Sequence, residues 1–137
     1  MKITDAKVFH DYLNGVIEGK DVKKSTKLYA SAKTFYKSVD SSIEDDCVMY
    51  EVYTYEHDGL NYGLTVMQPV CVNGECNMTR GHFHDDLDCD EIYCGMGGEG
   101  LLLLMDEDYH CYAEKVKCGS VHYIDGAFST SFDQYRK

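Results

Sequence analysis

The sequence predicts a mainly β protein, a sandwich or barrel of short strands, with a helical segment near the N-terminus. Three observations support this prediction. Residues 47–124 contain runs rich in β-branched and aromatic residues. Turn signals such as Asp-Gly, Asn-Gly and Gly-Gly separate these runs at intervals of about eight to twelve residues. Helical spacing of apolar residues occurs only before residue 40, and 137 residues suit a single domain.

The first predicted element is a helix in the N-terminal segment. Ser25 or Thr26 can cap its start, and the polar, acidic residues 40–46 end it. The apolar residues at helical spacing are Leu28, Tyr29, Ala32, Phe35, Tyr36 and Val39. We therefore expect an N-terminal segment, residues 1–46, whose helix packs on a β body formed by residues 47–137.

The predicted strands follow one another closely after residue 46. Asp58-Gly59 and Asn73-Gly74 mark tight turns, and Gly97-Gly98 and Cys118-Gly119 mark further breaks. The strand candidates are residues 47–55, 60–67, 78–84, 91–95, 100–105, 109–117 and 120–124.

Charge and hydropathy exclude several classes of partner. A net charge of −11 and a pI near 4.8 disfavour binding to nucleic acid or to anionic membranes. Residues 101–105 form the longest aliphatic run, far too short to span a membrane, and no signal peptide is recognisable, so we expect a cytoplasmic protein. Residues 1–40 carry a net charge of +3 against −14 for the rest. This basic segment either lies on the acidic body or attracts an anionic substrate.

The cysteines do not form a familiar pattern. There are seven of them, an odd number, and no CxxC pair occurs. This disfavours a disulfide framework, a zinc ribbon and a thioredoxin-type site. We expect reduced thiols, most of them small core residues.

The most informative stretch contains two histidines on a predicted strand. His82 and His84 point to one side of that strand, and Glu91 and Tyr93 share one face of the next. If the two strands pair as a hairpin, these four side chains line one concavity. Two imidazoles and a carboxylate are ligands that first-row divalent metals prefer. A histidine pair alone is more often ordinary, but the spacing of Glu91 and the adjacent Gly81 favour a metal site.

This stretch resembles the first metal motif of the cupin barrels, and more narrowly that of the cupin-type phosphoglucose isomerases. The motif reads Gly81-His82-Phe83-His84, six residues, Glu91-Ile92-Tyr93 and then Gly98-Glu99-Gly100. The similarity extends over residues 12–124. Further positions in register are Tyr50-Glu51-Val52-Tyr53, Leu60-Asn61, Thr65-Val66, Pro69 and Thr79.

The resemblance implies a cupin barrel, also called a double-stranded β-helix or jelly roll, and an enzyme of glycolysis and gluconeogenesis. It implies that His82, His84 and Glu91 bind a divalent metal ion such as Fe, Mn, Zn or Ni. Glu91 is also the candidate catalytic base, because a carboxylate can accept the C–H proton, and a metal-assisted hydride shift is the alternative. The implied substrates are glucose 6-phosphate and fructose 6-phosphate. The residues expected to line the sugar-phosphate pocket are Tyr50, Thr65, Thr79, Arg80, Gly81 and Tyr93.

The second motif of the family departs from its pattern in this chain. After Gly119, the expected Pro is Asp125 and the expected fourth ligand, a His, is Thr130. The sequence also ends at Lys137, so we expect a barrel that is incomplete at its C-terminus, with edge strands that a homodimer could cover. The alternative function is a catalytically impaired cupin that binds a sugar phosphate or a metal.

Overall fold

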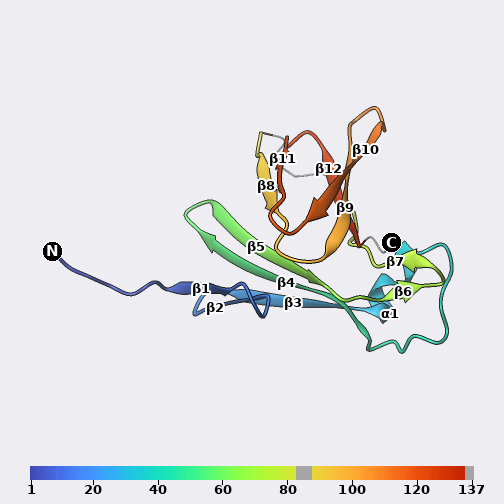
Figure 1. The fold of residues 1–137 in the computed structure, drawn as a ribbon, viewed down its shortest axis with the longest axis horizontal. Coiled ribbons are helices and arrows are strands. Elements are labelled where there is room, and N and C mark those ends of the chain that lie inside the picture. Colours follow the sequence, from blue (N-terminus) through green and yellow to red (C-terminus); the bar gives the residue numbers. More distant parts are fainter. Residues whose placement is uncertain (83–87, 135–137) are drawn as a thin grey trace. The chain divides into compact units, whose positions relative to one another are not determined.

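The fold is mainly β, as predicted, and the described residues form antiparallel strands and one short α-helix (Figure 1). The computed structural model describes residues 1–82 and 88–134. The chain forms two compact units: a first unit of residues 1–32 and 41–68, and a second unit of residues 33–40 and 69–137. The antiparallel β architecture is consistent with a cupin. No helix in the described part is long and apolar enough to cross a membrane.

The first unit contains a hairpin and a three-stranded sheet. The hairpin pairs β1 (Val8–Asp11) with β2 (Val16–Gly19), and the sheet has the order β3 (Lys23–Leu28), β4 (Val48–His57), β5 (Leu60–Met67). Asp58 and Gly59 join β4 to β5, and both have positive φ, 49° and 81°. Such a two-residue turn matches the twist of paired strands. The strands predicted at residues 47–55 and 60–67 are therefore confirmed.

The predicted N-terminal helix is much shorter in the structure. It is reduced to α1 (Tyr29–Ala32) and the 3-10 turn η1 (Lys33–Phe35). Ser25 and Thr26 are not caps, because they lie in β3 and pair with β4. The first amides of α1 instead bond backbone carbonyls, Tyr29 N–H to Cys47 at 2.8 Å and Ala30 N–H to Asp45 at 2.9 Å. Long-range strand pairing thus overrides the local helical spacing. The pairing of β3 with β4 also joins residues on both sides of residue 46, the predicted end of the N-terminal segment.

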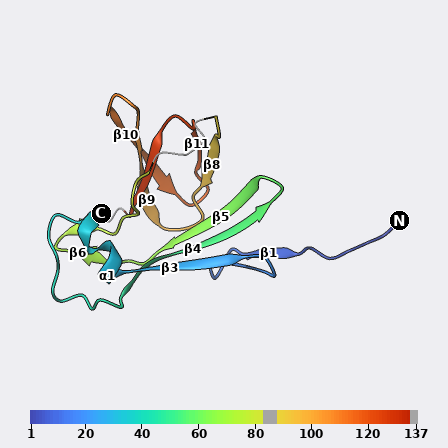
Figure 2. The same ribbon diagram turned by 180° about the vertical axis from the view of Figure 1, so that it is seen from behind.

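The second unit contains three groups of strands (Figures 1 and 2). Its three-stranded sheet has the order β10 (Cys111–Lys117), β9 (Glu99–Met105), β12 (Ser129–Gln134). A two-stranded ladder pairs β8 (Glu91–Cys94) with β11 (Val121–Ile124), and a small hairpin pairs β6 (Cys71–Val72) with β7 (Glu75–Cys76). Leu102, Leu104 and Ile124 form the buried core of this unit, with Tyr93, Val116 and Phe128 packed against them.

Two strand expectations change in the second unit. The predicted strand 78–84 is represented, within the described residues, by two isolated bridge residues, Met78 and His82, and His82 pairs with Thr130. The sequence predicts a hairpin in which the strand of His82 pairs with the strand of Glu91. In the described residues Glu91 lies on β8, and β8 pairs with β11 instead. Strand β12 was not predicted, because its sequence is polar and lacks alternation.

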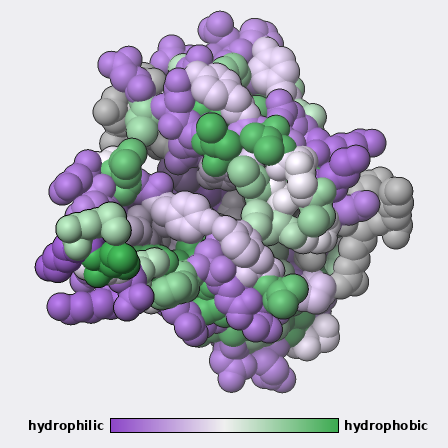
Figure 3. Space-filling model, turned by 60° about the vertical axis from the view of Figure 1, so that its left-hand side comes forward, coloured by the Kyte–Doolittle hydropathy of each residue, from purple (hydrophilic) through white to green (hydrophobic). Residues whose placement is uncertain are grey.

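The face seen in Figure 3 mixes hydrophilic side chains with scattered hydrophobic ones, as is usual for a protein surface.

Candidate functional site

One wall of the candidate site is the inner face of the β8–β11 ladder. Tyr93 lies opposite His122, and Glu91 lies opposite Ile124. Residues directly opposite each other in an antiparallel pair project to the same face. His122 and Ile124 are buried, and Glu91 and Tyr93 are half-buried, whereas the alternate residue Ile92 is 68% exposed. The predicted common face of Glu91 and Tyr93 is therefore confirmed.

The other wall is one face of the three-stranded sheet. Leu104 of β9 lies opposite Tyr112 of β10 and opposite Thr130 of β12. On its other side Thr130 bridges His82, with backbone hydrogen bonds of 3.1 and 3.3 Å. Tyr112, Leu104, Thr130 and His82 thus form one row across the sheet. This row brings a candidate metal ligand next to the buried core.

Tyr93 connects the two walls. Its hydroxyl lies close enough to the side chains of Glu91 and Thr130 for both to affect its pKa. Burial raises the pKa of Tyr93, and the negative charge of Glu91 raises it further. The Tyr93 hydroxyl therefore keeps its proton at neutral pH and can donate it in a hydrogen bond to the Glu91 carboxylate.

A second polar link joins the same two strand groups. His122 of β11 is 6% exposed. Its Nδ1 lies 2.5 Å from a carboxylate oxygen of Glu114, and its Nε2 lies 2.8 Å from the hydroxyl of Ser120. Sequence reasoning missed this group, because Glu114 and His122 are eight residues apart on different strands. No local pattern in the sequence would have found it, because the contact depends on how the strands pack.

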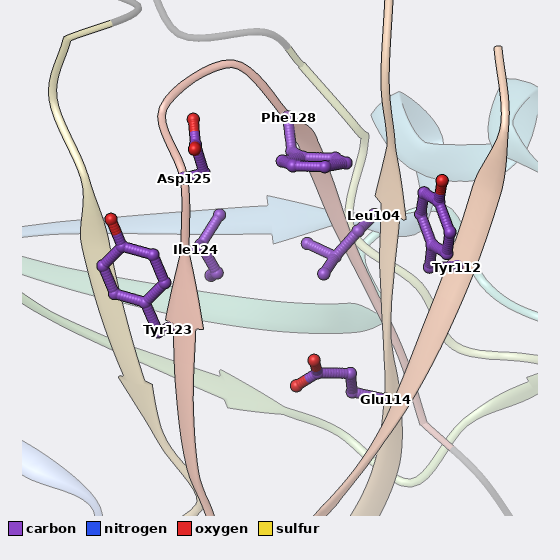
Figure 4. Close-up of a pocket in the computed structure, with 7 residues that line it drawn as sticks. All are labelled: Leu104, Tyr112, Glu114, Tyr123, Ile124, Asp125 and Phe128. Atoms are coloured by element: carbon purple, nitrogen blue, oxygen red, sulfur yellow. The ribbon is translucent and has the colours of Figure 1, made fainter.

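A hollow of about 380 Å³ lies between these elements (Figure 4). Most of its wall is apolar or aromatic, and Glu114 and Asp125 bring carboxylates to it. Its lining residues are Leu104, Tyr112, Glu114, Tyr123, Ile124, Asp125 and Phe128. A concave, largely apolar site with few polar groups is typical of small-molecule binding.

The predicted metal ligands are only partly described. His82 is exposed at its bridge to Thr130, Glu91 is half-buried beside Tyr93, and His84 lies outside the described residues. Within residues 1–82 and 88–134, no group of three or more His, Cys, Asp or Glu side chains is arranged to hold a metal ion. His82 and Glu91 nevertheless supply the imidazole and carboxylate donors that such an ion requires. The metal site stays a prediction.

The segment before His82 runs along β12. The Ser131 hydroxyl donates a hydrogen bond of 2.8 Å to the backbone carbonyl of Thr79. A Cβ on Gly81 would lie 3.4 Å from the Ser131 Cβ and 3.5 Å from the Thr130 carbonyl oxygen. Arg80 is exposed. These predicted substrate-binding residues therefore lie at the same edge of the sheet as His82.

The other two predicted pocket residues belong to the first unit. Thr65 lies opposite Val52, which stands two residues from Tyr50, so Tyr50 and Thr65 share one face of the β4–β5 pair. Tyr50 is buried and Thr65 is exposed. The predicted role of Tyr50 and Thr65 in binding the sugar phosphate stays a prediction.

Comparisons with known proteins identify similar chains. The family described as "Glucose-6-phosphate isomerase (GPI)" matches residues 19–124. A "Glucose-6-phosphate isomerase" of Thermococcus litoralis is 31% identical over 125 residues, covering 83% of this chain and 63% of that protein. Proteins of the same name from Pyrococcus furiosus and Thermococcus kodakarensis are each 32% identical, with the same 83% coverage of this chain. The chain thus spans less than two thirds of the length of these relatives.

Proposed function

Because the chain belongs to the glucose-6-phosphate isomerase family, we propose that it is a metal-dependent aldose–ketose isomerase. The proposed reaction interconverts glucose 6-phosphate and fructose 6-phosphate. One observation carries the proposal beyond family membership. Tyr93 contacts both Glu91 and Thr130, and Thr130 lies opposite His82. A candidate base, a proton donor and a candidate ligand therefore belong to one connected group.

The donor set supports a divalent metal ion. His82 and Glu91, together with His84, would hold it, and imidazole and carboxylate ligands suit Fe, Mn, Zn and Ni. Such an ion, when bound, would polarise the sugar carbonyl and stabilise the negative charge that develops during the reaction.

Glu91 is the proposed general base. Its carboxylate would take the proton from C2 of the open-chain aldose and deliver it to C1, while the proton of the C2 hydroxyl passes to O1, so that the carbonyl moves from C1 to C2. In this proposal the nearby Tyr93 hydroxyl would donate a hydrogen bond to this carboxylate and orient it. A carboxylate that binds an ion tightly is a poor free base, so Glu91 either leaves the ion when substrate binds or the hydrogen moves directly between C1 and C2 as hydride.

The segment from Thr79 to Gly81 is the proposed phosphate site. Arg80 is an exposed guanidinium at the edge of the sheet that carries His82. A guanidinium can donate two parallel hydrogen bonds to a phosphate. In this proposal Arg80 orients the sugar phosphate, while Glu91 and Tyr93 face its reacting carbons.

A coupled assay on the metal-free protein and on protein loaded separately with Fe²⁺, Mn²⁺, Zn²⁺ or Ni²⁺ tests the proposal. We expect turnover with at least one metal and its loss after chelation. Absence of turnover with every metal would reject the isomerase.

A second candidate function is binding without catalysis. It is favoured by Thr130, which is 3% exposed and occupies the position where the family resemblance calls for an imidazole ligand. In that case fructose 6-phosphate would raise the melting temperature of the protein although no turnover occurs with any of the four metals. Turnover would reject this second function.

A further inference from the structure

We propose that Cys71 and Cys76 form a redox-active dithiol that closes to a disulfide across the β6–β7 hairpin. This inference does not depend on the isomerase function. It starts from the pairing register, in which Cys71 and Cys76 lie directly opposite each other on neighbouring antiparallel strands. Both are free thiols in the structure.

The turn defines the geometry of this pair. Asn73 and Gly74 have φ values of 48° and 89°, which is the pattern of a two-residue type I′ hairpin. In such a hairpin the flanking pair, Val72 and Glu75, is the hydrogen-bonded one, so the next pair is non-hydrogen-bonded. Non-hydrogen-bonded pairs have Cα atoms about 4.5 Å apart, within the range of about 4.4–6.8 Å that disulfides span. The bond can therefore form with little backbone movement.

The hairpin is held in place by residues 36–40. The Asn73 amide donates to the Ser38 hydroxyl at 2.9 Å and to the Val39 carbonyl at 3.1 Å. The Lys37 N–H donates to the Glu75 carboxylate at 2.9 Å. Val72, on the face opposite the thiols, is fully buried. These contacts keep the two strands in register before any oxidation.

The two thiols differ in access to solvent. Cys71 is exposed and Cys76 is half-buried. A disulfide oxidant such as oxidised glutathione would therefore react first at Cys71. The Cys71 thiol loses its proton, its sulfur attacks the oxidant, and the departing glutathione thiolate takes up a proton. The Cys76 thiolate then attacks the Cys71 sulfur and releases a second glutathione, which takes up the second proton. Two protein thiols are oxidised, and one glutathione disulfide is reduced to two thiols.

Of the cysteines in the described residues, Cys71 and Cys76 alone are strand partners of each other. Cys94 lies opposite Val121, and Cys111 lies opposite Met105. An exposed thiol such as Cys111 has no strand partner that could resolve a mixed disulfide. It should stop at the glutathione adduct.

The experiment treats the native full chain with oxidised glutathione, alkylates the remaining thiols and maps the peptides by mass spectrometry. We expect a peptide pair joined through Cys71 and Cys76, lighter by two hydrogens than its reduced form. Cys76→Ser should instead carry glutathione on Cys71, while the matched control Cys111→Ser should form the same disulfide as the wild type.

Denaturation separates the fold's contribution from simple proximity. The measured quantity is the ratio of the Cys71–Cys76 disulfide to all other cysteine pairings. We expect this ratio to be at least tenfold lower in urea than in the native chain. Equal selectivity in both states would overturn the proposal. So would glutathione adducts that persist on native wild-type Cys71, or links from Cys71 to another cysteine.

Discussion

Thr130 lies directly opposite His82, and the two residues exchange backbone hydrogen bonds of 3.1 and 3.3 Å. Opposite residues in an antiparallel pair share a face, so the Thr130 side chain stands beside that of His82. Thr130 is also the position where the family resemblance calls for a fourth ligand. A ligand at position 130 would therefore lie beside His82, and the metal site itself stays a prediction.

The first prediction replaces the Thr130 hydroxyl by an imidazole. A hydroxyl is a poor ligand for a first-row divalent ion, whereas imidazole is a good one. Thr130→His should therefore tighten Mn²⁺ and Zn²⁺ binding by about tenfold, or about 1.4 kcal/mol. Isothermal titration measures this affinity, and circular dichroism checks that the variant folds. His82→Ala is the negative control, and equal affinities of wild type and Thr130→His would contradict the proposed site.

The second prediction concerns Tyr93, whose pKa is raised by burial and by Glu91. Because the folded protein holds this proton more tightly than the unfolded chain, the hydroxyl contributes its full stability below the unfolded pKa of about 10. This stability is lost as the pH rises from there through the higher folded pKa. Tyr93→Phe should cost about 1 kcal/mol at pH 8, and this difference from wild type should shrink above pH 10.

Urea unfolding between pH 8 and pH 11 measures the Tyr93 effect. The matched control is Tyr109→Phe, because Tyr109 is 77% exposed. Its stability should follow that of the wild type at every pH. A difference between wild type and Tyr93→Phe that stays constant across pH 10 would show that burial does not hold this proton.

The third prediction concerns the contact between His122 and Glu114, 2.5 Å apart. A double-mutant cycle of His122→Ala and Glu114→Ala should give a coupling free energy of about 1 kcal/mol. The value is modest because the Glu114 side chain is 47% exposed and solvent weakens the pair. Denaturant unfolding of the four proteins provides the measurement. Strict additivity of the two substitutions would mean that the contact contributes nothing.

The fourth prediction compares two glycines that have open space around them. Gly74 has a φ of 89°, a backbone angle that residues other than glycine rarely adopt. Gly97 does not have a positive φ of this kind. An added Cβ would meet no atom within 4 Å at either position. Gly74→Ala should cost about 1 kcal/mol of unfolding free energy, and Gly97→Ala should change it little. Similar melting temperatures for both variants would argue against the type I′ turn.

Local patterns predicted much of the fold. Strands β4 and β5 follow from β-branched and aromatic residues that flank Asp58-Gly59, and the alternation from Glu91 to Tyr93 was visible directly. Strand β3 was missed, because its sequence, Lys-Lys-Ser-Thr-Lys-Leu, is polar and owes its conformation to pairing with β4. The helix was overestimated for the same reason.

In the candidate site, too, only the features set by neighbouring residues in the sequence could be predicted. The face shared by Glu91 and Tyr93 follows from a period of two residues. The partner of His82 does not, because Thr130 is 48 positions away in a polar strand and only the family resemblance pointed to it. The burial of His122 depends on three strands that converge, and no local pattern carries that information.

The proposal that Glu91 is the general base is tested by the rate of isomerisation of the Glu91→Gln variant. In metal-loaded protein, this variant should lower kcat by about 10²–10⁴, because the amide cannot accept the substrate's proton. The matched control is Glu56→Gln, an exposed position on β4, which should keep the wild-type rate. A wild-type kcat in the folded, metal-loaded Glu91→Gln variant would show that Glu91 is not the general base.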